Sequence, residues 1–275
     1  LESLRSRGAL GAGVDVFALR DEVVAEYEGF IKGFLNIRDD AARAEVDRML
    51  DQGLLWPDPY LSLNPKFAPG GRVDDLAGKG LLHPEAVNIF RAKDEDSRIG
   101  RPETLGDPYS LYRHQVDAIE HAASDRNFVA TTGTGSGKSL TYIIPIVNHV
   151  LQHGSGQGIR AIIVYPMNAL ANSQMGELEK FLPDGNLRSR YDADTGKLDD
   201  SKPSGPVTFA RYTGQDEQNF RNAVIENPPD ILLTNYKMLD QLLLRAADAP
   251  IWQQSARSLQ YLVLDEFHTY DGAQG

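Results

Sequence analysis

The segment Thr131–Leu140, TTGTGSGKSL, constrains the fold of this chain more than any other stretch. The apolar run NFVATT (127–132) leads into its three glycines, and an apolar stretch with helical spacing follows Lys138. Strand, glycine loop and helix in this order let backbone N–H groups close around an anion at the helix N-terminus. A flexible glycine-rich turn is the alternative interpretation. The flanking elements favour a phosphate-binding loop.

The residues of this loop have separate expected roles in holding a nucleotide. Lys138 is expected to reach the β- and γ-phosphates, and the hydroxyl of Ser139 is expected to lie on Mg²⁺. Thr132 stands five residues before Gly137, where the strict pattern has glycine or alanine, and it is small enough to keep the loop intact. The other expected nucleotide-binding positions are Thr134, Gly135, Ser136 and Gly137.

A second chemical signal is the stretch YLVLDEFH at 261–268. Two adjacent carboxylates follow an apolar strand here. Asp265 is expected to hold Mg²⁺ through its water shell, and Glu266 to orient and deprotonate an attacking water. A strand followed by a solvated acidic turn is the alternative. Downstream of a phosphate loop on a parallel sheet, the pair predicts a nucleotide hydrolase.

From Tyr109 onward, apolar runs of strand character alternate with stretches of helical spacing. This order predicts an α/β fold with a mostly parallel sheet between helices. The polar stretch 182–206 interrupts the alternation and predicts a partly disordered surface insertion. The expected strands are 127–132, 159–166, 206–214, 230–235 and 259–266, and the expected helices are 138–152, 169–181, 219–227 and 236–247.

The part of the chain before this alternation is predicted to be a mainly helical N-terminal region. Helical spacing at 15–35 is followed by a second helix with Asp39 or Asp40 as its N-cap and Gly53 as its stop. The stretch 54–72 is rich in proline and glycine and predicts an extended connection. A charged, turn-prone stretch at 91–108 places the domain boundary, which gives domains 1–106 and 107–275.

Composition narrows the class of protein without naming it. Hydrophobic residues make up 41% and charged residues 24%, as in ordinary soluble globular proteins. The absence of cysteine excludes disulfides and thiolate zinc sites and fits a cytoplasmic protein, although secreted proteins also lack cysteine. No apolar run is long enough to span a bilayer, so no membrane partner is expected. The net charge of −11 argues against nonspecific coating of nucleic acid but leaves room for a local basic groove.

Several motifs together resemble the DEAD/DEAH-box helicases of superfamily 2. DEFH resembles motif II, with Phe267 in the usual alanine position, and LYRHQVDAIEHA resembles the Q motif. YPMNALANSQ resembles motif Ia, LLTNYKMLD resembles motif Ib, and ARYTGQ stands where the family has a short glycine motif. Their order and spacing match the first RecA-like domain over roughly 109–275, with the YprA-like branch most similar. The leading segment resembles that of helicases in anti-phage systems such as DISARM.

This resemblance implies a function and further site residues. The implied cofactors are ATP and Mg²⁺, with Gln115 on the adenine edge and His268 coupling the nucleotide site to a nucleic-acid site. The implied partner is nucleic acid, with DNA favoured over RNA, although helix capping is the alternative for Asn168 and Thr234. The residues implied to line the path of the nucleic-acid backbone are Pro166, Asn168, Ala169, Thr234 and Asn235.

Two other interpretations stay open. One is a different phosphate-loop ATPase, and the other is a helicase-like nucleic-acid-binding module without turnover. Intact Lys138, Asp265 and Glu266 argue against the second. Family members continue into motif III and a second RecA-like domain that supplies an arginine to the phosphoryl group. The 275 residues are therefore expected to bind Mg-nucleotide, to turn it over slowly and not to unwind alone, with the N-terminal region as the candidate for contacts with protein partners.

Overall fold

The computed structural model of the chain describes residues 16–35, 37–53, 67–93, 105–133 and 135–270. The chain divides into two compact units, Leu1–Pro65 and Lys66–Gly275. None of the described helices has the length and apolar character that crossing a membrane requires.

The first unit contains two helices, α2 (Val16–Phe34) and α3 (Asp40–Asp51), as the apolar spacing predicts. Asp39 caps α3, since its carboxylate accepts a hydrogen bond of 2.8 Å from the backbone N–H of Ala42. Lys32 joins the two helices through an ion pair of 3.0 Å with Asp51. Of the extended connection expected at 54–72, residues 54–66 lie outside the described part of the chain.

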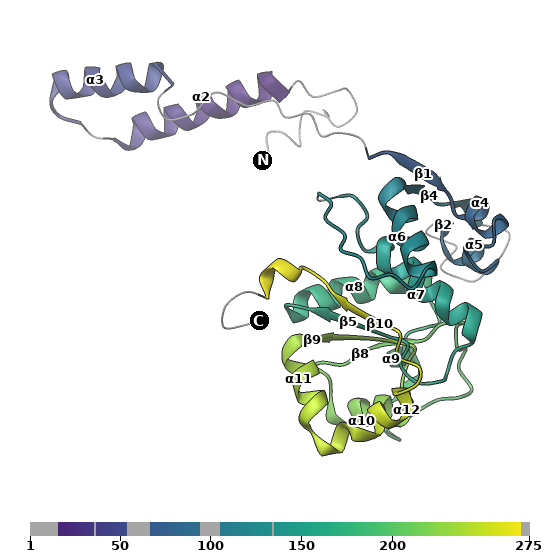
Figure 1. Ribbon diagram of the computed structural model, residues 1–275. Coiled ribbons are helices and arrows are strands. Elements are labelled where there is room, and N and C mark those ends of the chain that lie inside the picture. The colour runs from purple at the N-terminus through teal and green to yellow at the C-terminus, as the bar shows by residue number, and fades with distance from the viewer. Residues whose placement is uncertain (1–15, 36, 54–66, 94–104, 134, 271–275) are drawn as a thin grey trace. The chain divides into compact units, whose positions relative to one another are not determined.

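The second unit is built on a four-stranded parallel sheet, and this confirms the predicted α/β class (Figure 1). Along the sheet the strands lie in the order β10, β5, β9 and β8. Residue Ala161 pairs with Tyr261 on one side and with Ile231 on the other, so the strands start in register. The bounds are β5 (Ala161–Tyr165), β8 (Phe209–Arg211), β9 (Ile231–Asn235) and β10 (Tyr261–Leu264).

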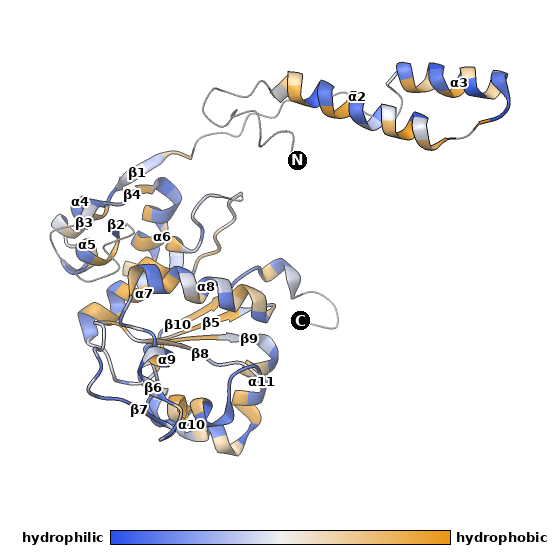
Figure 2. Cartoon of the chain, turned by 180° about the vertical axis from the view of Figure 1, so that it is seen from behind, coloured by the Kyte–Doolittle hydropathy of each residue, from blue (hydrophilic) through white to orange (hydrophobic). Residues whose placement is uncertain are grey.

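Helices cover the two faces of this sheet, with α7 and α8 on one side and α10, α11 and α12 on the other (Figure 1). The side chains of Ile163 and Leu233 belong to the core beneath α7, whereas the neighbouring Ile162 and Leu232 belong to the core against α10 and α12. Figure 2 shows β5 mostly in the colour of apolar residues, and α7 with apolar residues interspersed with polar ones. The bounds are α6 (Arg113–Ala123), α7 (Leu140–His153), α8 (Asn168–Phe181), α10 (Gln218–Glu226), α11 (Tyr236–Leu244) and α12 (Ala249–Ser255), with 3-10 turns at Ala246–Asp248 and Phe267–Thr269.

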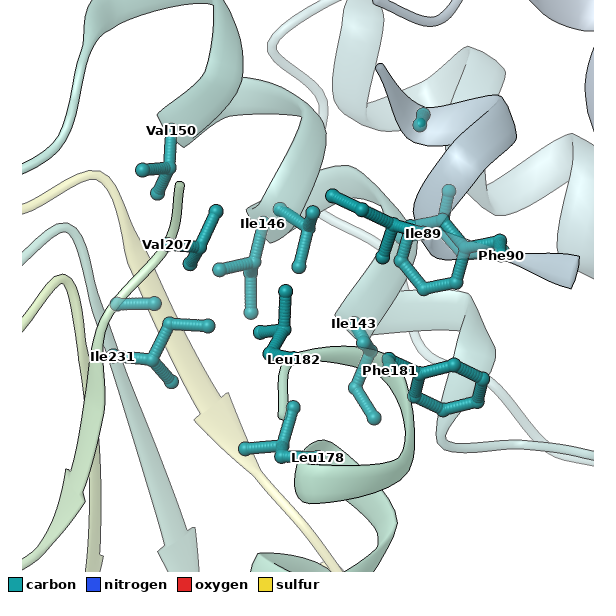
Figure 3. Close-up of a cluster of buried hydrophobic side chains, with 14 of the residues drawn as sticks. Ile89, Phe90, Ile143, Ile146, Val150, Leu178, Phe181, Leu182, Val207 and Ile231 are labelled. Atoms are coloured by element: carbon teal, nitrogen blue, oxygen red, sulfur yellow. The ribbon is translucent and has the colours of Figure 1, made fainter. Parts of the chain in front are cut away.

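Residues 67–93 and 105–112 pack into the same core as the sheet. Phe90 is fully buried, and its ring centroid lies 5.3 Å from that of Phe181 on α8. Figure 3 shows the two rings side by side. The compact unit therefore begins at Lys66, well before the boundary that the sequence places at 106/107. Short elements without a sustained period hide this packing from a sequence reading. They are β1 (Pro69–Arg72), α4 (Val73–Gly78), α5 (Ala86–Ile89), β2 (Arg91–Lys93), β3 (Leu105–Pro108) and β4 (Ser110–Tyr112).

The strand expected at 127–132 does not form. These residues have no regular secondary structure, and the side chain of Val129 is 84% exposed. A strand needs a neighbour for its N–H and C=O groups, and no described residue pairs with this segment. Strand β10 likewise pairs on one edge only among the described residues, and it exposes 60% of Leu262 and 42% of Leu264.

The polar stretch 182–206 is ordered, in contrast to the expected partly disordered insertion. It contains α9 (Leu187–Arg190) and a short hairpin of β6 (Tyr191–Asp192) and β7 (Lys197–Leu198). Asn186 caps α9 by accepting a hydrogen bond of 2.9 Å from the backbone of Arg188. Leu187 is buried in the core against α10. Leu182 is buried in the core beneath α7 as well. A few apolar anchors and local hydrogen bonds thus hold a segment whose overall composition is polar.

Phe90→Ala tests whether residues 67–93 and 105–112 fold with the sheet. The variant should lower the free energy of unfolding by about 3–5 kcal/mol, because it removes a fully buried aromatic side chain. Urea denaturation followed by circular dichroism measures the change. Phe34→Ala, at a side chain that is 81% exposed, is the matched control and should stay within about 0.5 kcal/mol. A separate early transition that leaves the main one unchanged would contradict the shared core.

Candidate nucleotide site and nucleic-acid edge

The glycine loop has the backbone conformation that only glycine adopts without strain. Gly135 and Gly137 have φ angles of +76° and +66°. A Cβ atom on Gly137 would lie 2.6 Å from Nε2 of Gln115, so the loop also passes too close to α6 for a side chain. Thr134 lies outside the described residues. The backbone of the loop therefore requires glycine at positions 135 and 137. This favours a phosphate-binding loop over a flexible glycine-rich turn.

Thr132, the departure from the strict pattern, bridges the loop. Its Oγ1 lies 2.7 Å from Oγ of Ser136, and Ser136 is buried. A glycine or alanine at this position has no hydroxyl for such a contact. The hydroxyl of Thr132 therefore links the two sides of the loop. The sequence predicts only that Thr132 is small enough to fit at this position.

Helix α6 holds the loop through side chains of the Q motif. Gln115 is 2% exposed, and its Nε2 donates to the carbonyl of Gly137 at 2.9 Å. Its Oε1 accepts from the backbone N–H of Tyr112 at 2.8 Å. Nε2 of His114 lies 3.0 Å from the carbonyl of Ser136. Gln115 positions the loop in this structure, and its hydrogen bond to adenine stays a prediction.

The helix after the loop begins at Leu140, two residues later than expected. Lys138 and Ser139 form the turn that leads into it, and both are partly exposed. The hydroxyl of Thr141 donates to the carbonyl of Lys138 at 2.6 Å. This bond fixes the backbone that carries the two expected ligand-binding side chains.

Tyr142 connects this helix to the acidic strand end. Its hydroxyl donates to Oδ2 of Asp265 at 3.3 Å and also interacts with Ser139. Burial, followed by the negative charge of Asp265, raises the pKa of Tyr142 to about 12. The tyrosine therefore stays protonated and can donate. Sequence reasoning missed this residue because it occupies an ordinary apolar position of α7; its place three residues after Ser139, one helical turn away, is the available signal.

Asp265 directly follows β10 and faces the phosphate loop across Tyr142. Its Oδ1 accepts the backbone N–H of Glu266 at 2.9 Å. Burial raises the pKa of Asp265 above its usual range; the hydrogen bond from Glu266 and, more weakly, the charge of Lys138 act in the opposite direction. The carboxylate is thus desolvated and poised for a cationic ligand.

Glu266 adopts a left-handed conformation, with φ 49° and ψ 45°, which is unusual for a residue other than glycine. Such strain is concentrated at functional sites, where the surrounding structure maintains it. His268 is exposed, and its Nδ1 lies 3.4 Å from Oε2 of Glu266. The structure therefore brings the two predicted residues together on the turn after β10.

The oxygen atoms available near the loop suit Mg²⁺. Ser139 and Asp265 both contact Tyr142, and a hydroxyl with a carboxylate is a hard-oxygen donor set. Among the described residues, no group of three or more His, Asp or Glu side chains forms a complete protein cage for a metal. Mg²⁺ commonly binds through one or two protein oxygens together with substrate phosphates, so these residues fit it.

The residues predicted to contact nucleic acid lie at the carboxyl ends of β5 and β9. Nδ2 of Asn235 donates to Oδ1 of Asn168 at 2.6 Å, which ties the two strand ends together. Asn235 also caps α11 by accepting the backbone N–H of Met238 at 2.8 Å. Pro166, Asn168 and Asn235 are partly exposed and Ala169 is exposed.

Thr234 differs from these neighbours because it is fully buried. Its hydroxyl donates to the carbonyl of Tyr212 at 2.8 Å and links the end of β9 to that of β8. Neither Thr234 nor Asn168 is a helix cap; Asn235 caps α11, and Met167 occupies the N-cap position of α8. The side chain of Thr234 therefore holds the edge together from inside.

Comparison with known sequences places this geometry in a family. Residues 112–275 match the DEAD/DEAH box helicase family, and this match covers more than half of the chain. The chain belongs to the DEAD/DEAH box helicase family. The resemblance inferred from the motifs is thereby confirmed.

Individual relatives agree with this assignment. The chain is 30% identical over 61% of its length to the uncharacterized ATP-dependent helicase MJ1574 of Methanocaldococcus jannaschii, and 29% identical over 60% to YprA of Bacillus subtilis. The Druantia protein DruE of Escherichia coli is 24% identical over 90% of the chain, a range that includes part of the N-terminal region. The chain spans 18–22% of the length of these three relatives.

A solved structure has the same fold. The helicase MrfA, in its crystal structure bound to DNA and AMPPNP, superimposes with a TM-score of 0.54 and 22% sequence identity. The match covers 82% of this chain and 26% of the MrfA chain.

Asp265→Asn should stabilise the protein at neutral pH. A carboxyl whose folded pKa lies above its unfolded pKa makes the folded state less stable once it ionises. The gain should shrink as the pH falls through the raised pKa, because both side chains are then uncharged. Thermal melts across a pH series measure this difference. Asp240→Asn, on the exposed face of α11, is the control and should melt like the wild type. A gain for Asp265→Asn that stays the same or falls as the pH rises from acidic to neutral would contradict burial as the cause.

Gly137→Ala should weaken binding of a fluorescent ATP analogue by about tenfold or more. The added Cβ meets Nε2 of Gln115 at 2.6 Å, and the left-handed backbone costs about 1–2 kcal/mol for an L-residue. Gly80→Ala is the matched control, since Gly80 has a similar φ of +76°, lies outside the loop, and its Cβ would meet nothing within 4 Å. Equal affinity in the two variants would show that the close approach to α6 does not matter for binding.

Proposed function

We propose that this chain is the ATP-binding first motor domain of a superfamily 2 helicase or translocase, which couples ATP hydrolysis with Mg²⁺ to movement on DNA. The observation that carries the proposal is the contact between Tyr142 and Asp265. It joins the helix after the glycine loop to the acidic strand end, at the same sheet edge that carries the polar residues after β5 and β9. Ligands of open α/β folds bind at this edge.

Each side chain of the nucleotide site has a chemical role in this proposal. Lys138 binds the β- and γ-phosphates at the N-terminus of α7, where the helix dipole also favours an anion. Glu266 orients the attacking water and accepts its proton. Ser139 and Asp265 hold Mg²⁺, which when bound neutralises charge on the phosphate oxygens.

The nucleic-acid strand runs along the carboxyl ends of β5 and β9. Pro166, Ala169 and Asn168 lie at the start of α8, and Asn235 lies at the start of α11. Amide side chains and helix N-termini suit phosphate contacts without base readout. The bond between Asn168 and Asn235 keeps the two segments at a fixed spacing. His268, beside Glu266, couples this edge to the nucleotide site.

The resemblance to the YprA-like branch favours DNA over RNA as the nucleic acid along which the motor moves. Parallel binding measurements with single-stranded DNA and RNA of one sequence would decide between them. The N-terminal region stays the candidate for protein contacts, and α2 exposes Phe30 and Phe34. An anti-phage role rests on the resemblance of the leading segment and on the similarity to the Druantia protein DruE.

A phosphate-loop ATPase without adenine readout is the second candidate, because both ends of the Gln115 amide bind protein backbone. Comparing ATP with GTP in Gln115→Ala separates the two. In the helicase proposal the preference for ATP falls, whereas an ATPase without adenine readout keeps the same ratio.

Lys138→Ala should weaken Mg-ATP binding by about 10- to 100-fold, because a charge-assisted hydrogen bond contributes about 1.5–3 kcal/mol. Isothermal titration measures the affinity, and ATP turnover with and without single-stranded DNA measures the coupling. Lys79→Ala removes an exposed lysine at the end of α4 and should behave like the wild type. Unchanged ATP affinity in Lys138→Ala would overturn the assignment of the loop.

A further inference from the structure

A cavity of about 240 Å³ lies next to the carboxyl end of β8, between α8 and the turn before α10. The motif ARYTGQ supplies Arg211 and Gln215 to its wall. Arg188 comes from the segment 182–206, which the alternating pattern does not explain. Its volume is below the range of about 300–1,000 Å³ that is typical of drug-sized ligands. The residues that carry the inference are Asn172, Met175, Arg188, Arg211, Gln215 and Phe220.

The cavity is electrically balanced, although two arginines line it. Arg211 pairs with Asp216 at 2.5 Å, and Arg188 pairs with Glu217 at 3.0 Å. All four of these residues line the cavity, so two positive and two negative charges cancel. A phosphate group would have to compete with a carboxylate for each guanidinium. The charge pattern therefore favours a neutral ligand.

One wall presents flat, rigid groups. The guanidinium carbon of Arg188 lies 4.7 Å from the ring centroid of Phe220 and 5.3 Å from that of Tyr191. Glu217 holds the same guanidinium from its edge. Met175 adds a polarisable apolar side chain. Planar guanidinium and aromatic groups of this kind are the surfaces on which unstacked bases are held.

Amide groups supply donors and acceptors beside this wall. Oδ1 of Asn172 accepts from Arg211, which leaves its NH₂ group for a ligand. The side chain of Gln215 is exposed, and within the described part of the chain its amide has no hydrogen-bond partner. Side-chain amides of Asn and Gln match the donor and acceptor pairs on the edges of nucleobases. The ligand chemistry is thus that of a neutral heterocycle with hydrogen-bonding edges.

The cavity continues the proposed nucleic-acid edge. Asn172 lies four residues after Asn168 on α8, so the two side chains lie on the same face of the helix. Asn168 in turn bonds Asn235 at the end of β9. Arg211, bonded to Asn172, ends β8 at the same sheet edge. A strand bound along Asn235 and Asn168 therefore reaches the cavity at its next step.

We propose that this cavity receives one unstacked nucleobase of the bound single strand. The proposal rests on the nucleic-acid edge of the proposed function and adds a base contact to a surface otherwise suited to phosphates. The base stacks against Arg188 and hydrogen-bonds to Gln215, while Asn168 and Asn235 hold the backbone beside it.

Fluorescence anisotropy with two strands of equal length tests the proposal. One strand carries thymine bases, and the other carries abasic sugar phosphates throughout. Wild-type protein should bind the base-bearing strand more tightly. Gln215→Ala should lower the affinity for that strand by about fivefold or more and leave the abasic strand unchanged. Gln253→Ala is the matched control, because Gln253 is exposed and lies on α12. Helix α12 lies at the opposite edge of the sheet, where the hydroxyl of Ser255 accepts the backbone N–H of Ile159, just before β5.

The other outcomes each overturn a defined part of this inference. Equal loss on both strands would mean that the cavity contacts the backbone, and no loss on either would mean that it contacts neither. Both results leave the nucleic-acid edge intact. Wild-type protein that binds neither strand at low salt would overturn the nucleic-acid edge of the proposed function and the base site with it. Arg188→Ala removes the stacking group and should show the same dependence on bases as Gln215→Ala.

Discussion

The parallel pairing of β5 with its neighbours is the constraint on which the rest of the second unit depends. Because β10, β5, β9 and β8 run in one direction and start in register, their carboxyl ends share one edge. Every backbone group inside the sheet is satisfied by a neighbouring strand, so side chains at this edge are left for ligands. Functional side chains from segments about a hundred residues apart in sequence therefore lie at one edge of the sheet.

Short polar contacts then fix the spacing along that edge. Thr234 ties β9 to β8 from inside, and Asn235 ties β9 to the start of α8. On the nucleotide side, Tyr142 connects the loop helix to Asp265. In the proposed function, these bonds are the physical route by which nucleotide state and nucleic-acid contact bias one another.

Apolar periodicity predicted the parallel sheet and most of its helices because both faces of β5 and β9 are buried. Motif spacing likewise brought Lys138, Ser139 and Asp265 to one place. Sequence reasoning failed where tertiary context decides. The run at 127–132 has strand composition but no partner, and Phe90 joins the core from an element too short to show a period. Tyr142 and the hydroxyl bridge of Thr132 depend on distances that no local pattern records.

The outer edge of β10, which pairs with no described strand, affects how this chain behaves in solution. Leu262 and Leu264 stand exposed on a strand whose outer N–H and C=O groups have no partner among the described residues. Such an edge is a template for strand addition by another copy, and aggregation through it grows with concentration and with salts that strengthen apolar burial. Binding measurements should therefore use dilute protein and low concentrations of kosmotropic salt, because these conditions limit aggregation through this edge.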